Sequence, residues 1–284
     1  MIPAAFEYSR PSTVEEAVRA LADAGEDAKV LAGGQSLLPV LRMRLAAPTV
    51  VVDIGRVAEL RGVSEEADHL VIGAMTTHYD VARDHLVQEH ASLIVRATET
   101  VADPQIRHRG TFGGSLAHAD PAGDLLAPAL ALGAVMVVVG PAGRREVPAS
   151  EFFVDYFTTT LAPDELLVAV RIPKHTGWLS HYEKFNRVAQ AWSIVAVGVS
   201  LQVSGGKIAD ARVGLTNMAS VPVRAVGVEQ ALIGQPAGAD VLRAAAEHAA
   251  EGTSPGSDGN GDAAYRSQLA KVLTGRALAL AVGG

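Results

Sequence analysis

Two short glycine-glycine segments, far apart in the chain, constrain its fold more than any other feature. They are Leu31-Ala32-Gly33-Gly34-Gln35-Ser36-Leu37 and Gly110-Thr111-Phe112-Gly113-Gly114-Ser115-Leu116. Paired glycines let neighbouring backbone N–H groups point into one concavity that no side chain blocks. Two such nests, with Ser36 capping a helix beside the first, could hold a pyrophosphate from both sides. Ordinary strand-end turns would explain either segment taken singly.

Neither segment is one of the common nucleotide-binding motifs. The spacing of a Rossmann GxGxxG is missing, as is the acidic residue that follows it, and no Walker A sequence is present. Neither segment is therefore a Rossmann-type or a P-loop phosphate site.

The absence of cysteine narrows the chemistry. The chain has 284 residues and no Cys, which excludes disulfides, Cys-ligated iron–sulfur clusters, Cys-rich zinc sites and a thiol nucleophile. The nine histidines contain no HExxH and no close pair at helical spacing, so we expect no metal site. A redox role would then require an organic cofactor.

Bulk composition limits the partners. Apolar residues make up 49% of the chain, enough for a substantial core, and the net charge is −7. That charge disfavours nucleic acid or an anionic membrane as the main partner. No apolar run of transmembrane length and no secretory signal is readable. The expected location is cytoplasmic, with association with the inner face of the membrane left open.

Periodicity predicts an α+β protein of two parts, residues 1–176 and 177–284, the first divided into subdomains of about 1–55 and 56–176. Expected helices cover 14–24, 37–45, 81–86, 91–101, 125–132, 226–232, 239–250 and 263–282. Expected strands cover 29–31, 49–54, 70–75, 135–139, 145–147, 165–172, 194–203 and 208–216.

Polar side chains are dense around the second segment. They are Asp103, Gln105, Arg107, His108, Ser115, His118, Asp120 and Asp124. Because a carboxylate repels a phosphate, Asp124 suits sugar or ribityl hydroxyls, or it simply caps the helix after it. Asp103, before Pro104, is equally a turn former, and the histidines could be surface residues.

Two residues in the second half could meet a flat ring. Trp192 could stack on a heteroaromatic system, although a lone Trp more often packs in a core. Lys184 could meet an electron-rich part of a cofactor, or it could be a solvated strand residue.

As a set, the motifs resemble the flavin subunits of molybdenum-containing hydroxylases. Both glycine segments match, and other stretches are similar to the medium subunits of aerobic carbon monoxide dehydrogenases. These stretches are 72–77, 102–107, 214–217, 257–259 and 265–266. The resemblance runs from end to end.

The resemblance implies an FAD-binding PCMH/VAO-type domain of two α/β subdomains, followed by a C-terminal α/β domain of a sheet with helices. It also implies a small subunit with two [2Fe–2S] clusters and a large subunit with the molybdenum cofactor, as a dimer of heterotrimers. The large subunit would oxidise CO with water to CO2, and electrons would pass through the clusters to FAD and on to an external acceptor such as a quinone. No residue of this chain would be catalytic.

By the same resemblance, a set of residues contacts FAD, with Trp192 shielding the ring. The set is Ala32, Gly33, Gly34, Gln35, Ser36, Leu37, Thr111, Phe112, Gly113, Gly114, Ser115, His118, Asp120, Asp124, Leu167, Lys184 and Trp192. Two departures concern the ring: Ser115 replaces a usual Asn, and Ala189-Gln190-Ala191 replaces a usual Gly-Asp run.

Three rivals stay open. The chain could serve another molybdenum hydroxylase that acts on an aldehyde, xanthine or an N-heterocycle. It could be a stand-alone FAD reductase, although we find no clear substrate acid in its second half. It could also be a non-enzymatic adaptor whose glycines only turn the chain.

Overall fold

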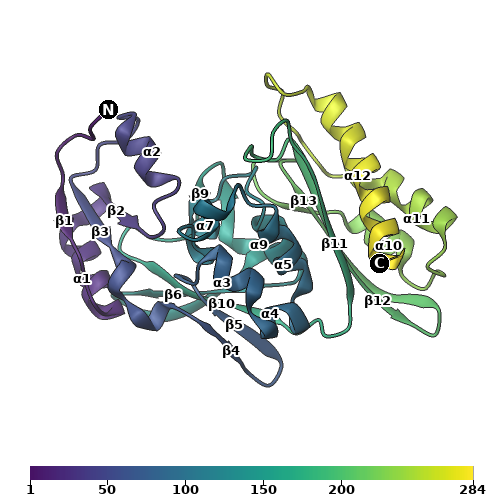
Figure 1. Cartoon of the computed structure of the whole chain (residues 1–284), viewed down its shortest axis with the longest axis horizontal. Helices are drawn as coiled ribbons and strands as arrows, with labels where there is room; N and C mark the ends of the chain where they lie inside the picture. The colour runs from purple at the N-terminus through teal and green to yellow at the C-terminus, as the bar shows by residue number, and fades with distance from the viewer. Residues whose placement is uncertain (284) are drawn as a thin grey trace.

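The computed structural model describes residues 1–283 and arranges three main sheets in a row, with helices packed against each of them (Figure 1). The first sheet is parallel, in the order β1-β3-β2, and α1 packs against it. Its elements are β1 (Glu7–Ser9), α1 (Val14–Ala24), β2 (Ala28–Leu31), α2 (Leu37–Arg42) and β3 (Val50–Asp53). The Thr13 hydroxyl caps α1 by accepting the N–H of Glu16.

The central sheet is antiparallel, in the order β4-β5-β10-β6-β7. Its strands are β4 (Val63–Glu65), β5 (His69–Gly73), β6 (Val135–Gly140), β7 (Gly143–Pro148) and β10 (Leu166–Pro173). The long connection from β5 to β6 holds α3 (His78–Arg83), α4 (His85–His90), α5 (Ser92–Glu99), α6 (Pro104–Arg107), α7 (Phe112–His118) and α8 (Leu126–Ala131). After β7 come α9 (Ala149–Phe152) and the ribbon β8 (Phe153–Asp155) and β9 (Thr158–Thr159).

The third sheet is antiparallel, in the order β11-β12-β13-β14. Its strands are β11 (Leu179–Phe185), β12 (Val195–Ser204), β13 (Lys207–Thr216) and β14 (Val223–Arg224). One face is covered by α10 (Val226–Leu232), α11 (Ala239–Ala246) and α12 (Ala263–Gly283), and the other packs on α5 and α8 (Figure 1). Gly214 permits the close approach of β13 to α8, since a Cβ there would lie 2.5 Å from the Ala127 carbonyl oxygen.

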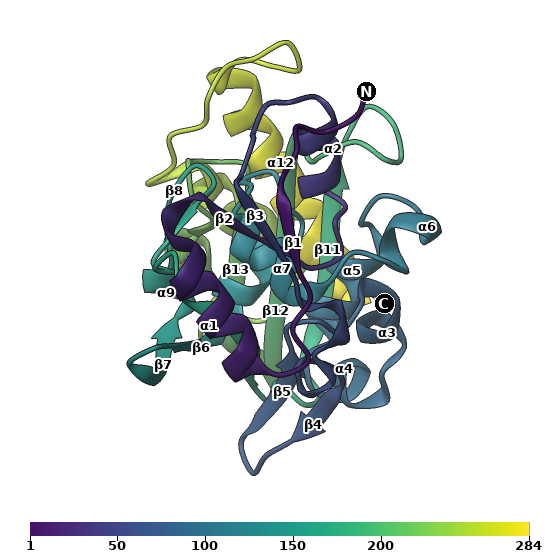
Figure 2. The same cartoon turned by 90° about the vertical axis from the view of Figure 1, so that its left-hand side faces the viewer.

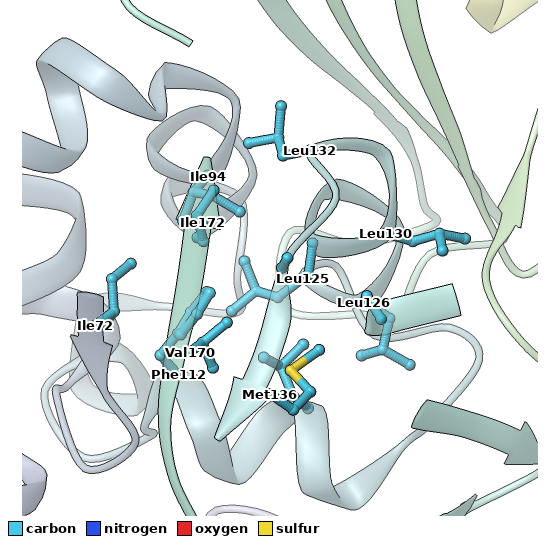
Figure 3. Packing of buried hydrophobic residues seen from close by; sticks show 14 of the residues in the cluster. Ile72, Ile94, Phe112, Leu125, Leu126, Leu130, Leu132, Met136, Val170 and Ile172 are labelled. Atoms are coloured by element: carbon cyan, nitrogen blue, oxygen red, sulfur yellow. The ribbon is translucent and has the colours of Figure 1, made fainter. Parts of the chain in front are cut away.

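A continuous apolar core joins the central sheet to the helices that cover it. Figure 3 shows Phe112 of α7 beside Val170 of β10, with Met136 of β6 close by. All three side chains are fully buried. Figure 2 looks along the row from its N-terminal side, with α1 and β1 nearest the viewer and α12 behind them. Among residues 1–283, no helix has both the length and the apolarity that crossing a bilayer requires.

Several local expectations were wrong. The helix predicted over 37–45 ends at Arg42, and the Ser36 side chain makes no capping hydrogen bond. Gly113 and Gly114 lie in the first helical turn of α7 rather than in a loop at the end of a strand. Asp124 does not cap the next helix, because α8 begins at Leu126 and its N-cap position is Leu125. The sequence pattern also missed β1, β4 and β11.

Candidate functional site

The two glycine segments contact each other, although the first follows β2 of the first sheet and the second lies in the connection between β5 and β6 of the central sheet. A Cβ on Gly33 would overlap the carbonyl oxygen of Arg109 and lie 2.8 Å from the Cα of Gly110. A Cβ on Gly114 would lie 3.3 Å from the Cβ of Ala32. Glycine at position 33 therefore allows backbone to pack on backbone, and the predicted convergence of the segments is present.

The first segment presents a row of free backbone donors. Among residues 1–283, no backbone N–H group from Gly33 to Leu37 donates a hydrogen bond to another protein atom. Gly34 has φ +75°, which turns the chain in a way that favours glycine. Most of this segment is only partly buried. Consecutive free N–H groups beside the start of a helix form an anion-binding concavity.

The second segment differs from the first in its backbone hydrogen bonds. Its backbone donors are used within the protein: the N–H groups of Phe112 and Gly113 donate to carbonyls of the connection after β5, at 2.9 Å each. The Thr111 hydroxyl accepts the N–H of Gly114 at 3.2 Å, as an N-cap. Phe112 is fully buried in the core. The second segment therefore packs against the first and offers no second row of free donors. That residues 111–115 contact FAD stays a prediction.

Asp124 is the centre of a buried polar cluster between the central part and the third sheet. Its carboxylate accepts from Lys184 Nζ at 2.7 Å, Ser193 Oγ at 2.8 Å and Tyr182 OH at 3.0 Å. Lys184 also donates to the Thr100 carbonyl oxygen at 3.2 Å, so its expected alternative as a solvated residue was wrong. Burial raises the pKa of Asp124, and the Lys184 ammonium opposes that shift.

Trp192 is 54% exposed, so the alternative that it packs in a core was wrong. It stands on the segment 186–193, which forms most of the connection of residues 186–194 between β11 and β12. It lines an open hollow of about 350 Å³ whose other walls include Asp120, Arg187, Asn217, Asp258 and Arg266. An exposed indole at the rim of a hollow is available to stack on a ligand ring.

The remaining predicted residues lie in three different settings. His118 is the last residue of α7 and Asp120 follows that helix; burial lowers the pKa of His118 and raises that of Asp120. Asp120 reaches the Trp192 hollow, while the His118 ring packs on Phe157. Leu167, by contrast, is buried in the core of the central sheet. Gln35 and Ser115 stay half-exposed at the two glycine segments.

Sequence reasoning missed Tyr182 and Ser193, and it named Gln190 only as part of a departure from the family pattern. Tyr182 and Lys184 lie two residues apart on the inward face of β11, a pairing that recognition of this strand would have indicated. Gln190 donates to the carboxylate of Asp103 at 2.5 Å. Asp103 itself caps α6 by accepting the N–H of Ile106, which agrees with its reading as a turn former.

Comparison with known proteins covers nearly the whole chain. Residues 4–175 match the FAD binding domain in molybdopterin dehydrogenase, and residues 180–281 match the CO dehydrogenase flavoprotein C-terminal domain. The carbon monoxide dehydrogenase medium chain of Hydrogenophaga pseudoflava is 41% identical over 98% of this chain and 97% of that protein. The nicotine 6-hydroxylase medium subunit of Paenarthrobacter nicotinovorans is 37% identical over 96% of each.

Solved structures agree. Carbon monoxide dehydrogenase from Hydrogenophaga pseudoflava superposes with a TM-score of 0.96 at 42% identity, covering 100% of this chain and 99% of that chain. Quinoline 2-oxidoreductase from Pseudomonas putida 86 gives 0.94 at 35% identity, with the same coverage. The expected fold, an FAD-binding domain followed by a flavoprotein C-terminal domain, is confirmed. The chain therefore belongs to the FAD-binding family of the molybdopterin dehydrogenases, as a medium chain of the carbon monoxide dehydrogenase type.

Proposed function

We propose that this chain is the FAD-carrying electron-transfer subunit of an aerobic carbon monoxide dehydrogenase. The row of free backbone N–H groups from Gly33 to Leu37 carries the proposal, because it is built for an anion and has no partner within residues 1–283. Family membership makes the pyrophosphate of FAD the natural anion.

The residues present fit this group. Neither glycine segment contains an acidic side chain, and Arg109 immediately precedes the second. A phosphate near Gly33 would therefore meet backbone donors and no carboxylate from either segment. The space beside Gly33 and Gly114 is closed by backbone and by Ala32, so the concavity would keep its shape when the ligand binds.

The ring end of the site would lie between the two parts of the chain. Lys184 and Trp192 come from the second part, and Asp124 from the first. Trp192 would cover the ring, and the buried ion pair of Asp124 and Lys184 would fix the local charge. FAD supplies the chemistry when bound, since it takes up and releases electrons singly or in pairs, while the protein binds, orients and shields it.

The same proposal extends to the assembly. A small subunit would hold the [2Fe–2S] clusters and a large subunit the molybdenum cofactor, in a dimer of heterotrimers that delivers electrons to an external acceptor such as a quinone. The absence of cysteine supports this division, since this chain cannot ligate the clusters by thiolate. A cytoplasmic location, with contact with the membrane inner face left open, belongs to the proposal too.

A second candidate is the flavin subunit of a hydroxylase for N-heterocycles. The 37% identity to the nicotine 6-hydroxylase medium subunit lies only a little below the 41% to the carbon monoxide dehydrogenase chain. The substrate would be oxidised on another subunit, so residues of this chain do not decide between the two.

One preparation tests both candidates. The chain is purified with its native partners, and CO, nicotine or quinoline is added without oxygen while flavin absorbance is recorded. Bleaching by CO alone supports the proposal, whereas bleaching by a heterocycle alone supports the second candidate. We expect non-covalent flavin, since the chain has no Cys for a thioether, so acid precipitation should release all of it; yellow colour retained in the pellet would contradict this. A colourless preparation that binds no added FAD would contradict both.

A further inference from the structure

The segment 186–193 carries Trp192 and is held at its C-terminal end by the third sheet. The Asn217 side chain donates to the carbonyl oxygens of Ser193 and Ile194, at 2.9 Å and 3.2 Å. The N–H of Ile194 donates to the carbonyl of Phe185 at 2.8 Å. These bonds close the base of the segment, but they do not determine how it sits against the FAD-binding part.

Two side chains of the segment cross to the FAD-binding part, and each ends on a carboxylate. Ser193 donates to Asp124 at 2.8 Å, in a buried position. Gln190 donates to Asp103 at 2.5 Å, at the surface. Trp192 lies between these two anchors in the sequence and makes no hydrogen bond of its own among the described residues.

Both carboxylates are themselves fixed. Asp124 is tied to Lys184 and Tyr182, and Asp103 accepts the N–H of Ile106 at 2.9 Å as the cap of α6. Hydrogen bonds to a charged acceptor are stronger than neutral ones, and the buried Ser193 bond is shielded from water. Connections between strands are generally more mobile than the strands themselves. The two anchors therefore tie this connection to fixed points on the FAD-binding part.

We propose that Gln190 and Ser193 are positioning residues that hold Trp192 over the flavin ring by tying its segment to Asp103 and Asp124. The inference rests on the proposed function, because it needs a ring for Trp192 to cover. Without the anchors, the segment would become ordered only when FAD binds. The lost conformational entropy would then reduce the affinity for FAD.

The test uses the full-length chain in a Trp178→Phe background, which leaves Trp192 as the one tryptophan, since the chain has two. Acrylamide quenching of Trp192 is measured without FAD, and FAD affinity and flavin midpoint potential are measured after titration. Gln190→Ala and Ser193→Ala should each increase quenching, raise the Kd for FAD about tenfold and shift the potential. Ser193→Thr, which keeps the hydroxyl, should restore all three.

Matched controls separate positioning from general loss of stability. Gln268→Ala removes an exposed glutamine of α12, and Ser180→Ala removes a buried serine that bonds to Ser200 at 2.8 Å. Neither should change the quenching or the potential. Unchanged quenching and potential in the anchor variants would overturn the inference. A parent chain that bound no FAD would refute the proposed function instead, and the quenching comparison would still decide whether the anchors hold Trp192.

Discussion

Substituting Gly33 by alanine should damage the cofactor site through backbone crowding alone. The new Cβ would overlap the Arg109 carbonyl oxygen and lie 2.8 Å from the Cα of Gly110. Carbon atoms in contact prefer separations of about 3.5–4.0 Å, so the two segments must move apart by roughly 1 Å. Overpacking of this kind costs about 1–3 kcal/mol, and each kcal/mol lowers Tm by about 2–4 °C in a chain of comparable size.

The same displacement should weaken FAD binding more than it weakens the fold. The donors from Gly33 to Leu37 would no longer be held against the second segment, and we expect a loss of at least about tenfold in affinity, which is about 1.4 kcal/mol. Thermal unfolding of the apoprotein and titration with FAD, followed by flavin fluorescence, measure the two effects separately. Gly259→Ala is the control, because its Cβ would enter open space. A Gly33→Ala chain with the Tm and the affinity of the parent would refute the close packing of the segments.

Three further outcomes are expected. Gly114→Val places a Cβ 2.5 Å from Thr111 Oγ1 and should displace the cap of α7, so flavin retained at parental occupancy would contradict the site. Trp192→Ala should weaken FAD binding by about 0.5–1.5 kcal/mol. It should leave Tm nearly unchanged, because the side chain is exposed; a large fall in Tm would show instead that Trp192 stabilises the fold. Burial, with Arg107 nearby, lowers the pKa of His78 from 6.5 to about 4, so the unfolded chain binds the proton more readily. The free energy of unfolding should fall by up to about 3 kcal/mol as the pH drops from 6.5 to about 4. Denaturant titrations at several pH values should show that His78→Gln reduces this dependence of the free energy of unfolding on pH, whereas the exposed His85→Gln leaves it unchanged.

The elements that periodicity predicted are those whose apolar residues face a core. The hairpin of β12 and β13 and the helix α12 were all expected within a residue or two. The strand β11 was missed because its inward face carries Tyr182 and Lys184, polar residues whose buried partner, Asp124, is far away in the sequence. A single sequence gives no sign of such a partner.

The second glycine segment shows the opposite error. Glycine disfavours a helix by about 1 kcal/mol relative to alanine, so Gly113-Gly114 predicted a turn. The structure places both in α7, because a Cβ at Gly113 would overlap Ala74 and only a bare backbone fits there. Tertiary packing outweighs local propensity at this position. The sequence analysis expected the two segments to converge. It did not predict that the first would keep its backbone N–H groups free while the second would use its own within the protein, because that depends on which N–H groups find acceptors elsewhere in the fold.

The strand order of the central sheet has a consequence for how the protein is made. The strand β10 lies between β5 and β6, which do not pair with each other, so the sheet cannot close until residues 166–173 have left the ribosome. Until then both neighbours keep an unpaired edge, which is prone to aggregation. The connection that carries α7 and Asp124 runs from β5 to β6, the two strands that are still unpaired on this side. A nascent chain released before β10 would thus present an unfinished site, and FAD added during synthesis should bind only after this strand has been inserted.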